Sequence, residues 1–103
     1  MRRLVGIAAL ALWMASPPVA LAGNADAGAQ LARQWCTSCH LVDDSMQGPD
    51  TAPPFPTIAR RRAQNETWVR AWLMAPHPPM PNLNLSRQEI DDIVAYLNSL
   101  KPR

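Results

Sequence analysis

The chain has 103 residues, with ten Lys and Arg against eight Asp and Glu, so its formal net charge at pH 7 is +2. This length is enough for one small domain and too short for two of ordinary size. Two of the cations, Arg2 and Arg3, stand at the amino terminus, and without them the net charge is zero, so a nucleic acid partner is not expected.

Residues 1–22 have the pattern of a secretory signal peptide. A short basic start precedes an uncharged apolar run over residues 4–15, and residues 20–22 form an A-x-A cleavage motif. An uncleaved anchor would need about 20 apolar residues, whereas two prolines interrupt this run at positions 17 and 18. We therefore expect cleavage after Ala22, export to the periplasm without membrane insertion, and a mature domain over residues 23–103.

A first helix is predicted to run from a cap at Asn24 or Asp26 toward Trp35, because alanine and other helix-compatible residues fill the interval. This helix leads directly into Cys36. No alternating strand pattern appears in residues 23–103, so the chain is predicted to be all-α.

Cys36, Cys39 and His40 form the pattern C-x-x-C-H, the spacing at which haem is attached covalently. Each thiol can add to one haem vinyl group, and the adjacent imidazole can then bind the iron as the proximal ligand. A structural disulfide is an alternative, but a bridge that closes so short a loop would add little stability. A thioredoxin-like redox pair would need a βαβ context, which the sequence lacks. The motif predicts one covalently bound haem c.

An extended loop is predicted over residues 43–56, because four prolines there exclude a regular helix. A short helix then follows Asn65 or Thr67 and ends at Met74. Within it, Trp68 and Trp72 are four residues apart and share a face. Packing is the plain interpretation of these indoles, and donation of an indole N–H to a haem propionate is the alternative that spacing leaves open.

Residues 76–81 form a second proline-rich segment that holds Met80 between Pro79 and Pro81. The restricted backbone angles of the prolines would position the Met80 sulfur at small entropic cost. Met46 and Met74 are further methionines, and His77 is the only other histidine. In an extended segment His77 and Met80 would be about 9 Å apart, so only one of them could reach an iron.

The last helix has the most complete start signals. Ser86 and Glu89 form a capping box, and Leu85 and Ile90 occupy the positions of a hydrophobic staple. One apolar face follows, and Pro102 comes after the end of the helix; the face is made of Ile90, Ile93, Val94, Leu97 and Leu100.

From Asn24 to Leu100 this order of elements resembles the small bacterial class I cytochromes c. The resemblance implies the cytochrome c fold, with three main helices around one covalently attached haem. It also implies that Met80 is the distal iron ligand opposite His40, and that a proline carbonyl accepts a hydrogen bond from the His40 ring. Pro53 matches that proline, and Pro49 is the alternative.

The resemblance further implies that the first and last helices cross with a small residue against an aromatic one, which Gly28 and Tyr96 would supply. The family often has an aromatic residue where this chain has Ala32. Packing at the crossing would then rely on Leu31 or Trp35.

Ligation by both His40 and Met80 leaves the iron no open position for a substrate, so a one-electron carrier is expected rather than an enzyme. It would act as a monomer between redox partner proteins and dock mainly through apolar surface, with Arg60, Arg61 and Arg62 as a solvated face or a docking contact. The alternatives are the haem subunit of a larger oxidoreductase, and a haem enzyme or gas-binding domain with a labile sixth ligand.

Overall fold

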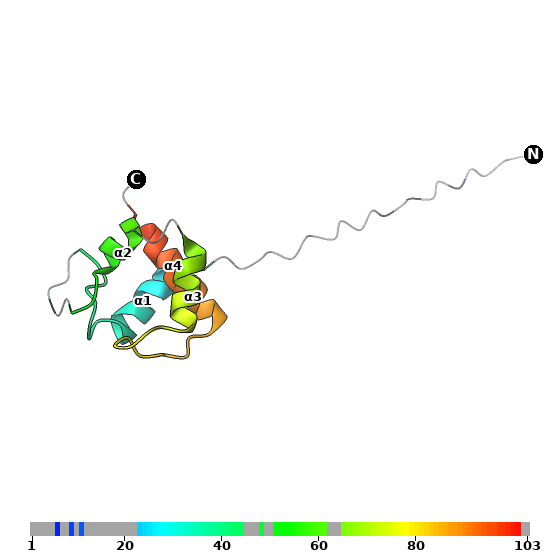
Figure 1. Ribbon diagram of the computed structural model, residues 1–103. Coiled ribbons are helices and arrows are strands. Elements are labelled where there is room, and N and C mark those ends of the chain that lie inside the picture. Colours follow the sequence, from blue (N-terminus) through cyan, green and yellow to red (C-terminus); the bar gives the residue numbers. More distant parts are fainter. Residues whose placement is uncertain are drawn as a thin grey trace, which may run out of the picture.

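The computed structural model describes residues 23–44, 48, 51–61 and 65–101, together with residues 6, 9 and 11. These residues contain four helices and no strand: α1 (Ala25–Trp35), α2 (Phe55–Arg61), α3 (Glu66–Met74) and α4 (Arg87–Ser99). The all-α prediction is confirmed for this part of the chain. Figure 1 shows α4 at the centre of the domain, with the other three helices packed against it. Apart from residues 6, 9 and 11, the predicted signal peptide lies outside the described residues, and so does its cleavage motif.

Helix α2 was not expected, and the prediction of an extended loop as far as Pro56 is wrong at its end. The helix begins at Phe55, so Pro56 lies in its first turn. A proline is tolerated there because the first N–H groups of a helix have no partner within it. The amide of Ile58 donates to the carbonyl of Pro54 at 3.0 Å and closes this first turn.

The two long helices start at side-chain caps. The Asn24 side chain accepts from the amide of Ala27 at 3.1 Å, so Asn24 rather than Asp26 caps α1. At α4 the predicted capping box is present in full: Ser86 Oγ accepts from the Glu89 amide at 3.1 Å, and Glu89 Oε1 accepts from the Ser86 amide at 2.9 Å. Each cap satisfies backbone donors that the helix itself leaves free.

Helices α1 and α4 cross with their backbones in contact at Gly28. A side chain at this buried position would overlap the carbonyl oxygen of Asp92, and its Cβ would lie 2.9 Å from the Cβ of Tyr96. Ala32 is fully buried on the same helix and Leu31 packs against the core, whereas Trp35 is 53% exposed. The crossing is therefore filled without the aromatic residue that the family often has at position 32.

Polar contacts join the other segments to α4. The Tyr96 hydroxyl donates to the carbonyl of Val42 at 2.6 Å, and Asp92 Oδ1 accepts from the amide of Asn24 at 2.8 Å. The Arg70 guanidinium on α3 forms a hydrogen-bonded ion pair with Asp91. Around these contacts lies one apolar core, whose buried members are Ala29, Ala32, Val42, Phe55, Val69, Ile90, Ile93, Val94, Tyr96 and Leu97.

None of the helices seen in the described residues is long and apolar enough to cross a membrane. Met46, Pro49, Arg62 and Pro102, which the sequence analysis singled out, lie outside those residues.

Replacement of Gly28 by alanine should lower the free energy of unfolding by about 1–3 kcal/mol, because the added methyl group would force two helix backbones apart. The loss should exceed the gain in helix propensity, which is about 1 kcal/mol. Gly48→Ala is the matched control, since a Cβ there would meet only the side chain of Leu41 at 3.9 Å. Denaturant unfolding of the two variants would show equal stability if the crossing did not depend on glycine.

Candidate haem-attachment site

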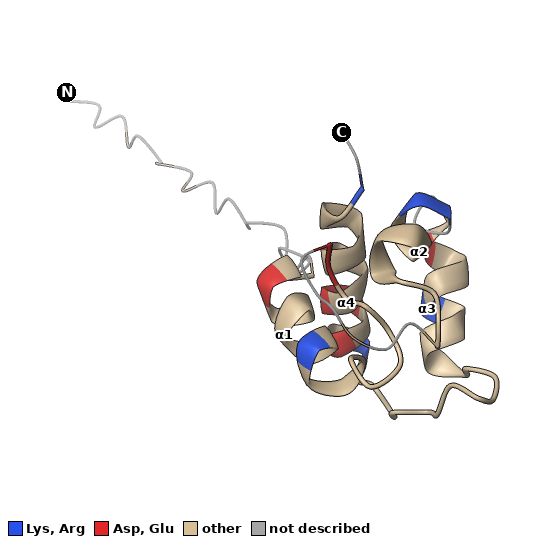
Figure 2. Cartoon of the chain, turned by 90° about the vertical axis from the view of Figure 1, so that its left-hand side faces the viewer, with Lys and Arg blue, Asp and Glu red and all other residues tan. Residues whose placement is uncertain are grey.

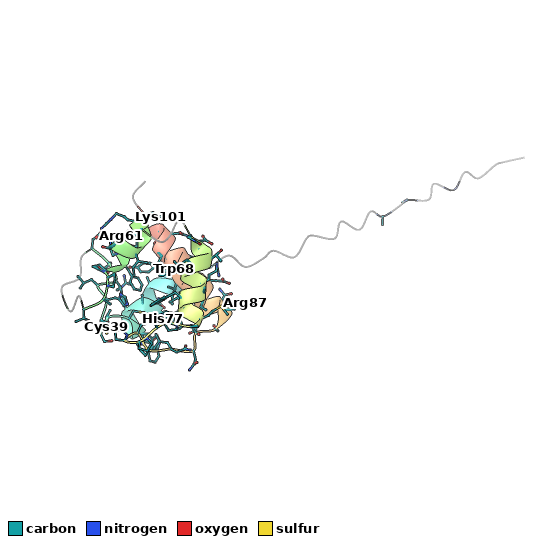
Figure 3. The ribbon with its side chains drawn as sticks, in the orientation of Figure 1. Cys39, Arg61, Trp68, His77, Arg87 and Lys101 are labelled. Carbon is teal, nitrogen blue, oxygen red and sulfur yellow. The ribbon has the colours of Figure 1, made fainter. Side chains whose placement is uncertain are left out.

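The end of α1 places the three motif residues within one further turn of chain. The amide of Cys36 donates to the carbonyl of Ala32 at 2.9 Å, and the amide of His40 donates to the carbonyl of Cys36 at 2.9 Å. Both cysteines are free; Cys36 is half-buried and Cys39 is exposed. Figure 3 shows Cys39 and His77 toward the same end of the domain, opposite Arg61 and Lys101.

The two thiols differ in environment. Burial raises the pKa of Cys36 from 9.0 to about 11, because the low-dielectric core disfavours the thiolate. Since the thiolate is the form that attacks a disulfide or an oxidant, this burial lowers the reactivity of Cys36 in the folded chain. The more exposed Cys39 lies at the surface of the same turn.

Main-chain hydrogen bonds hold the loop that follows the C-x-x-C-H motif against the motif itself. The amide of Ala52 donates to the carbonyl of Cys39 at 3.0 Å, and the amide of Phe55 donates to the carbonyl of Leu41 at 2.8 Å. These bonds hold residues 52–55 along residues 39–41. Pro53 lies within this paired stretch, and its carbonyl oxygen faces the ring of His40.

The ring of His40 is oriented by two contacts. Its Nδ1 lies 2.6 Å from the carbonyl oxygen of Pro53, and its ring makes a T-shaped contact with Phe55, with ring centroids 5.3 Å apart. A carbonyl can only accept, so Nδ1 carries the proton and donates it, and in the neutral imidazole Nε2 then has the lone pair. A neutral imidazole in this tautomer can bind a metal through Nε2. Pro53 is the same proline that the sequence analysis preferred.

Met80 is partly buried and its position is fixed from two sides. Its amide donates to the carbonyl of His77 at 3.0 Å, which closes a turn over residues 77–80. The indole Nε1 of Trp72 donates to its sulfur at 3.1 Å. Met74, the other methionine considered in this region, is 67% exposed. Its exposure leaves Met80 as the better sheltered sulfur of the two.

Trp72 also stacks on two aromatic rings. The centroid of Trp68 lies 5.4 Å away with an interplanar angle of 15°, and that of His77 lies 5.0 Å away at 25°. The ring of the exposed His77 is thus packed on an indole. The donation from Trp72 to Met80 was not foreseen; no periodic spacing connects a residue on α3 to one in the proline-rich segment.

These residues suit a covalently bound haem. Two free thiols three positions apart, an imidazole with its Nε2 lone pair available and a thioether sulfur are the donor set by which c-type haem is held. Over the described residues, no group of three or more Cys, His, Asp or Glu side chains gathers closely enough to hold a bare metal ion. The donors therefore fit a flat cofactor with an iron at its centre better than an isolated ion.

Comparison with known proteins gives the same family. The family model described as Cytochrome c matches residues 25–101. The chain is 40% identical to a cytochrome c-552 of Bradyrhizobium diazoefficiens, over 96% of each chain. It is 30% identical to a cytochrome c-553-like protein of Synechocystis, over 82% of this chain and 77% of the relative. No solved structure matches significantly.

The family match spans nearly all of the described domain, and its haem is attached through a C-x-x-C-H motif such as the one that contains Cys36 and Cys39. The chain therefore belongs to the cytochrome c family of electron-carrying proteins with covalently attached haem c.

Proposed function

We propose that this cytochrome is an exported monohaem carrier that moves single electrons between redox partner proteins. Its haem would be bonded through Cys36 and Cys39, with His40 and Met80 on the two faces of the iron. The observation that carries the proposal is the His40–Pro53 hydrogen bond, because it fixes the imidazole tautomer with Nε2 available.

Pro53, His40 and Met80 would each have a distinct role at the haem. The haem iron supplies a one-electron couple when it is bound. Pro53 makes the His40 imidazole a stronger donor by accepting its proton-bearing nitrogen. Met80 contributes a weakly donating thioether, which favours the ferrous state and raises the reduction potential. If His40 and Met80 both bind the iron, no position is left for a substrate, which supports a carrier rather than an enzyme.

Export is proposed from the sequence of residues 1–22, with cleavage before Gly23. Loss of Arg2 and Arg3 leaves the domain without net charge before the haem propionates are counted. Figure 2 shows the basic end of α2, where Arg60 and Arg61 are exposed. A near-neutral carrier with one small basic end would form brief complexes that depend little on salt, unless a partner places acidic residues against that end.

The protein isolated from the periplasm should have the intact mass of residues 23–103 plus one haem, because both thiols add to vinyl groups and the signal peptide is removed. Mass spectrometry after acid–acetone extraction checks both points together. The Cys36→Ser, Cys39→Ser double variant is the control and should release any haem it holds. A colourless protein with a disulfide, or haem that extracts from the unmutated chain, would overturn the attachment.

Met80→Ala should abolish the weak sulfur-to-iron charge-transfer band at the red end of the ferric spectrum, since that band needs a thioether on the iron. His77→Ala should keep it, because the His77 ring is packed on Trp72. Optical spectra of the two ferric variants make the comparison. The opposite pattern would assign the distal position to His77.

The ferrous protein should bind carbon monoxide slowly near neutral pH, because an axial ligand must leave first, while a small outer-sphere reagent should exchange electrons fast. Stopped-flow kinetics measures both. Rapid carbon monoxide binding with peroxidase turnover would favour a haem enzyme or gas-binding domain instead.

Neutral replacement of Arg60, Arg61 and Arg62 together tests whether a partner docks acidic residues against the basic end of α2. With such a partner, the association rate should fall steeply at low salt.

A further inference from the structure

Gly23, the residue that follows the expected cleavage site, packs its backbone directly against α4. A side chain at this position would overlap the carbonyl oxygen of Asp91, and its Cβ would lie 3.1 Å from the Cβ of Ala95. Gly28 makes the equivalent contact one position further along α4. The close approach of the two chain segments at the helix crossing therefore extends back to the first residue of the expected mature domain.

The carboxylate of Asp92 lies beside this contact and is only 7% exposed. Its Oδ1 accepts from the amide of Asn24 at 2.8 Å and from the side-chain amide of Gln88 at 2.9 Å. Both donors are neutral. Its Oδ2 accepts no hydrogen bond from the described residues. The carboxylate thus has acceptor capacity left over.

No side-chain cation balances this buried charge. Within the described part of the chain, no Lys, Arg or His side chain forms an ion pair with Asp92. The neighbouring carboxylate of Asp91 is different, because it is paired with Arg70 of α3. Since a buried carboxylate without a cation is costly, the surroundings of Asp92 favour a positive charge from another source.

The amino group of a cleaved chain is placed to supply that charge. Cleavage before Gly23 would convert a neutral amide nitrogen into an α-ammonium, which carries three donors. The next nitrogen along the chain, that of Asn24, lies 2.8 Å from Asp92 Oδ1. Because one residue spans at most about 3.6 Å, the nitrogen of Gly23 lies within about 6.5 Å of the same oxygen. Opposite charges at this range stabilise each other.

We propose that the α-ammonium of Gly23 is the counter-ion of the buried Asp92 carboxylate, an inference that rests on the proposed cleavage after Ala22. The first mature residue must then be glycine, because any side chain would overlap the Asp91 carbonyl and displace the amine from α4. Removal of the signal peptide would thereby complete the polar contacts of the α1–α4 crossing with a charge that the precursor does not have.

Other charges on the neighbouring elements act more weakly on the amine. Asp91 on α4 is paired with Arg70 on α3, so these two charges largely cancel. Asp26 lies in the first turn of α1 and is exposed, so water and salt screen it. The dipole of α1 disfavours a cation at its start, although the Asn24 side chain already covers an N–H there. We expect Asp92 to dominate and to raise the pKa of the amine.

An NMR titration of the Gly23 α protons in the ferrous haem-loaded protein measures this pKa. It should lie above the ordinary range of α-amino groups, because the nearby carboxylate stabilises the ammonium. Asp92→Asn keeps the shape and the acceptor oxygen but removes the charge, and should weaken proton binding by the amine about threefold to tenfold. Asp26→Asn is the matched control, since it removes the same charge from an exposed neighbour, and should change proton binding less than twofold.

Gly23→Ala tests the steric half of the proposal with the carboxylate intact. The added methyl group should displace the amine and weaken its proton binding by a factor similar to that of Asp92→Asn. In the double variant the second change should add little, because either one already removes the same interaction.

An ordinary pKa in the unmutated protein would overturn the inference, and this measurement stands even if a variant does not fold. An equal effect of Asp26→Asn, no effect of Asp92→Asn or of Gly23→Ala, or additive effects in the double variant would also overturn it. The intact mass identifies the first residue of each sample. A first residue other than Gly23 in the unmutated protein would refute the proposed cleavage itself, which is a failure of the proposed function.

Discussion

The backbone contact between α1 and α4 at Gly28 is the constraint on which the remainder of the domain depends. Because α1 continues directly into Cys36 and His40, the place where α1 rests on α4 decides where the attachment motif lies. Helix α4 then fixes the chain beyond the motif, since Tyr96 binds the Val42 carbonyl. A larger residue at the crossing would shift both ends of this arrangement together.

The two proposed axial residues are supported by contacts of the same two kinds. The His40 ring contacts the carbonyl of Pro53, whose loop is held by main-chain hydrogen bonds, and the ring of Phe55, which begins α2. Met80 is held by its amide, which donates to the carbonyl of His77, and by the indole of Trp72, which donates to its sulfur. Each proposed axial residue thus has one contact with a main-chain carbonyl and one with an aromatic side chain.

The features that local sequence patterns predicted have local causes, whereas the Gly28–Tyr96 crossing and the His40–Pro53 contact were expected from the family resemblance. The Ser86–Glu89 capping box, the Asn24 cap and the C-x-x-C-H turn each depend on residues within a few positions. Helix α2 was missed because Pro56 was interpreted as a helix breaker, although a proline in a first turn is permitted. The Trp72–Met80 and Trp72–His77 contacts join a helix to an irregular proline segment, so their geometry depends on a chain path that no periodicity encodes.

Burial of Cys36 has a consequence for the reactivity of its thiol. With a pKa of about 11, only roughly one Cys36 thiol in ten thousand is ionised at pH 7 in the folded chain. In an open chain the same thiol would be ionised about a hundred times more often, because its ordinary pKa is 9.0. The nucleophilic form of Cys36 is thus much rarer in the folded domain than in an open chain, so this thiol reacts more readily before the domain has closed around it.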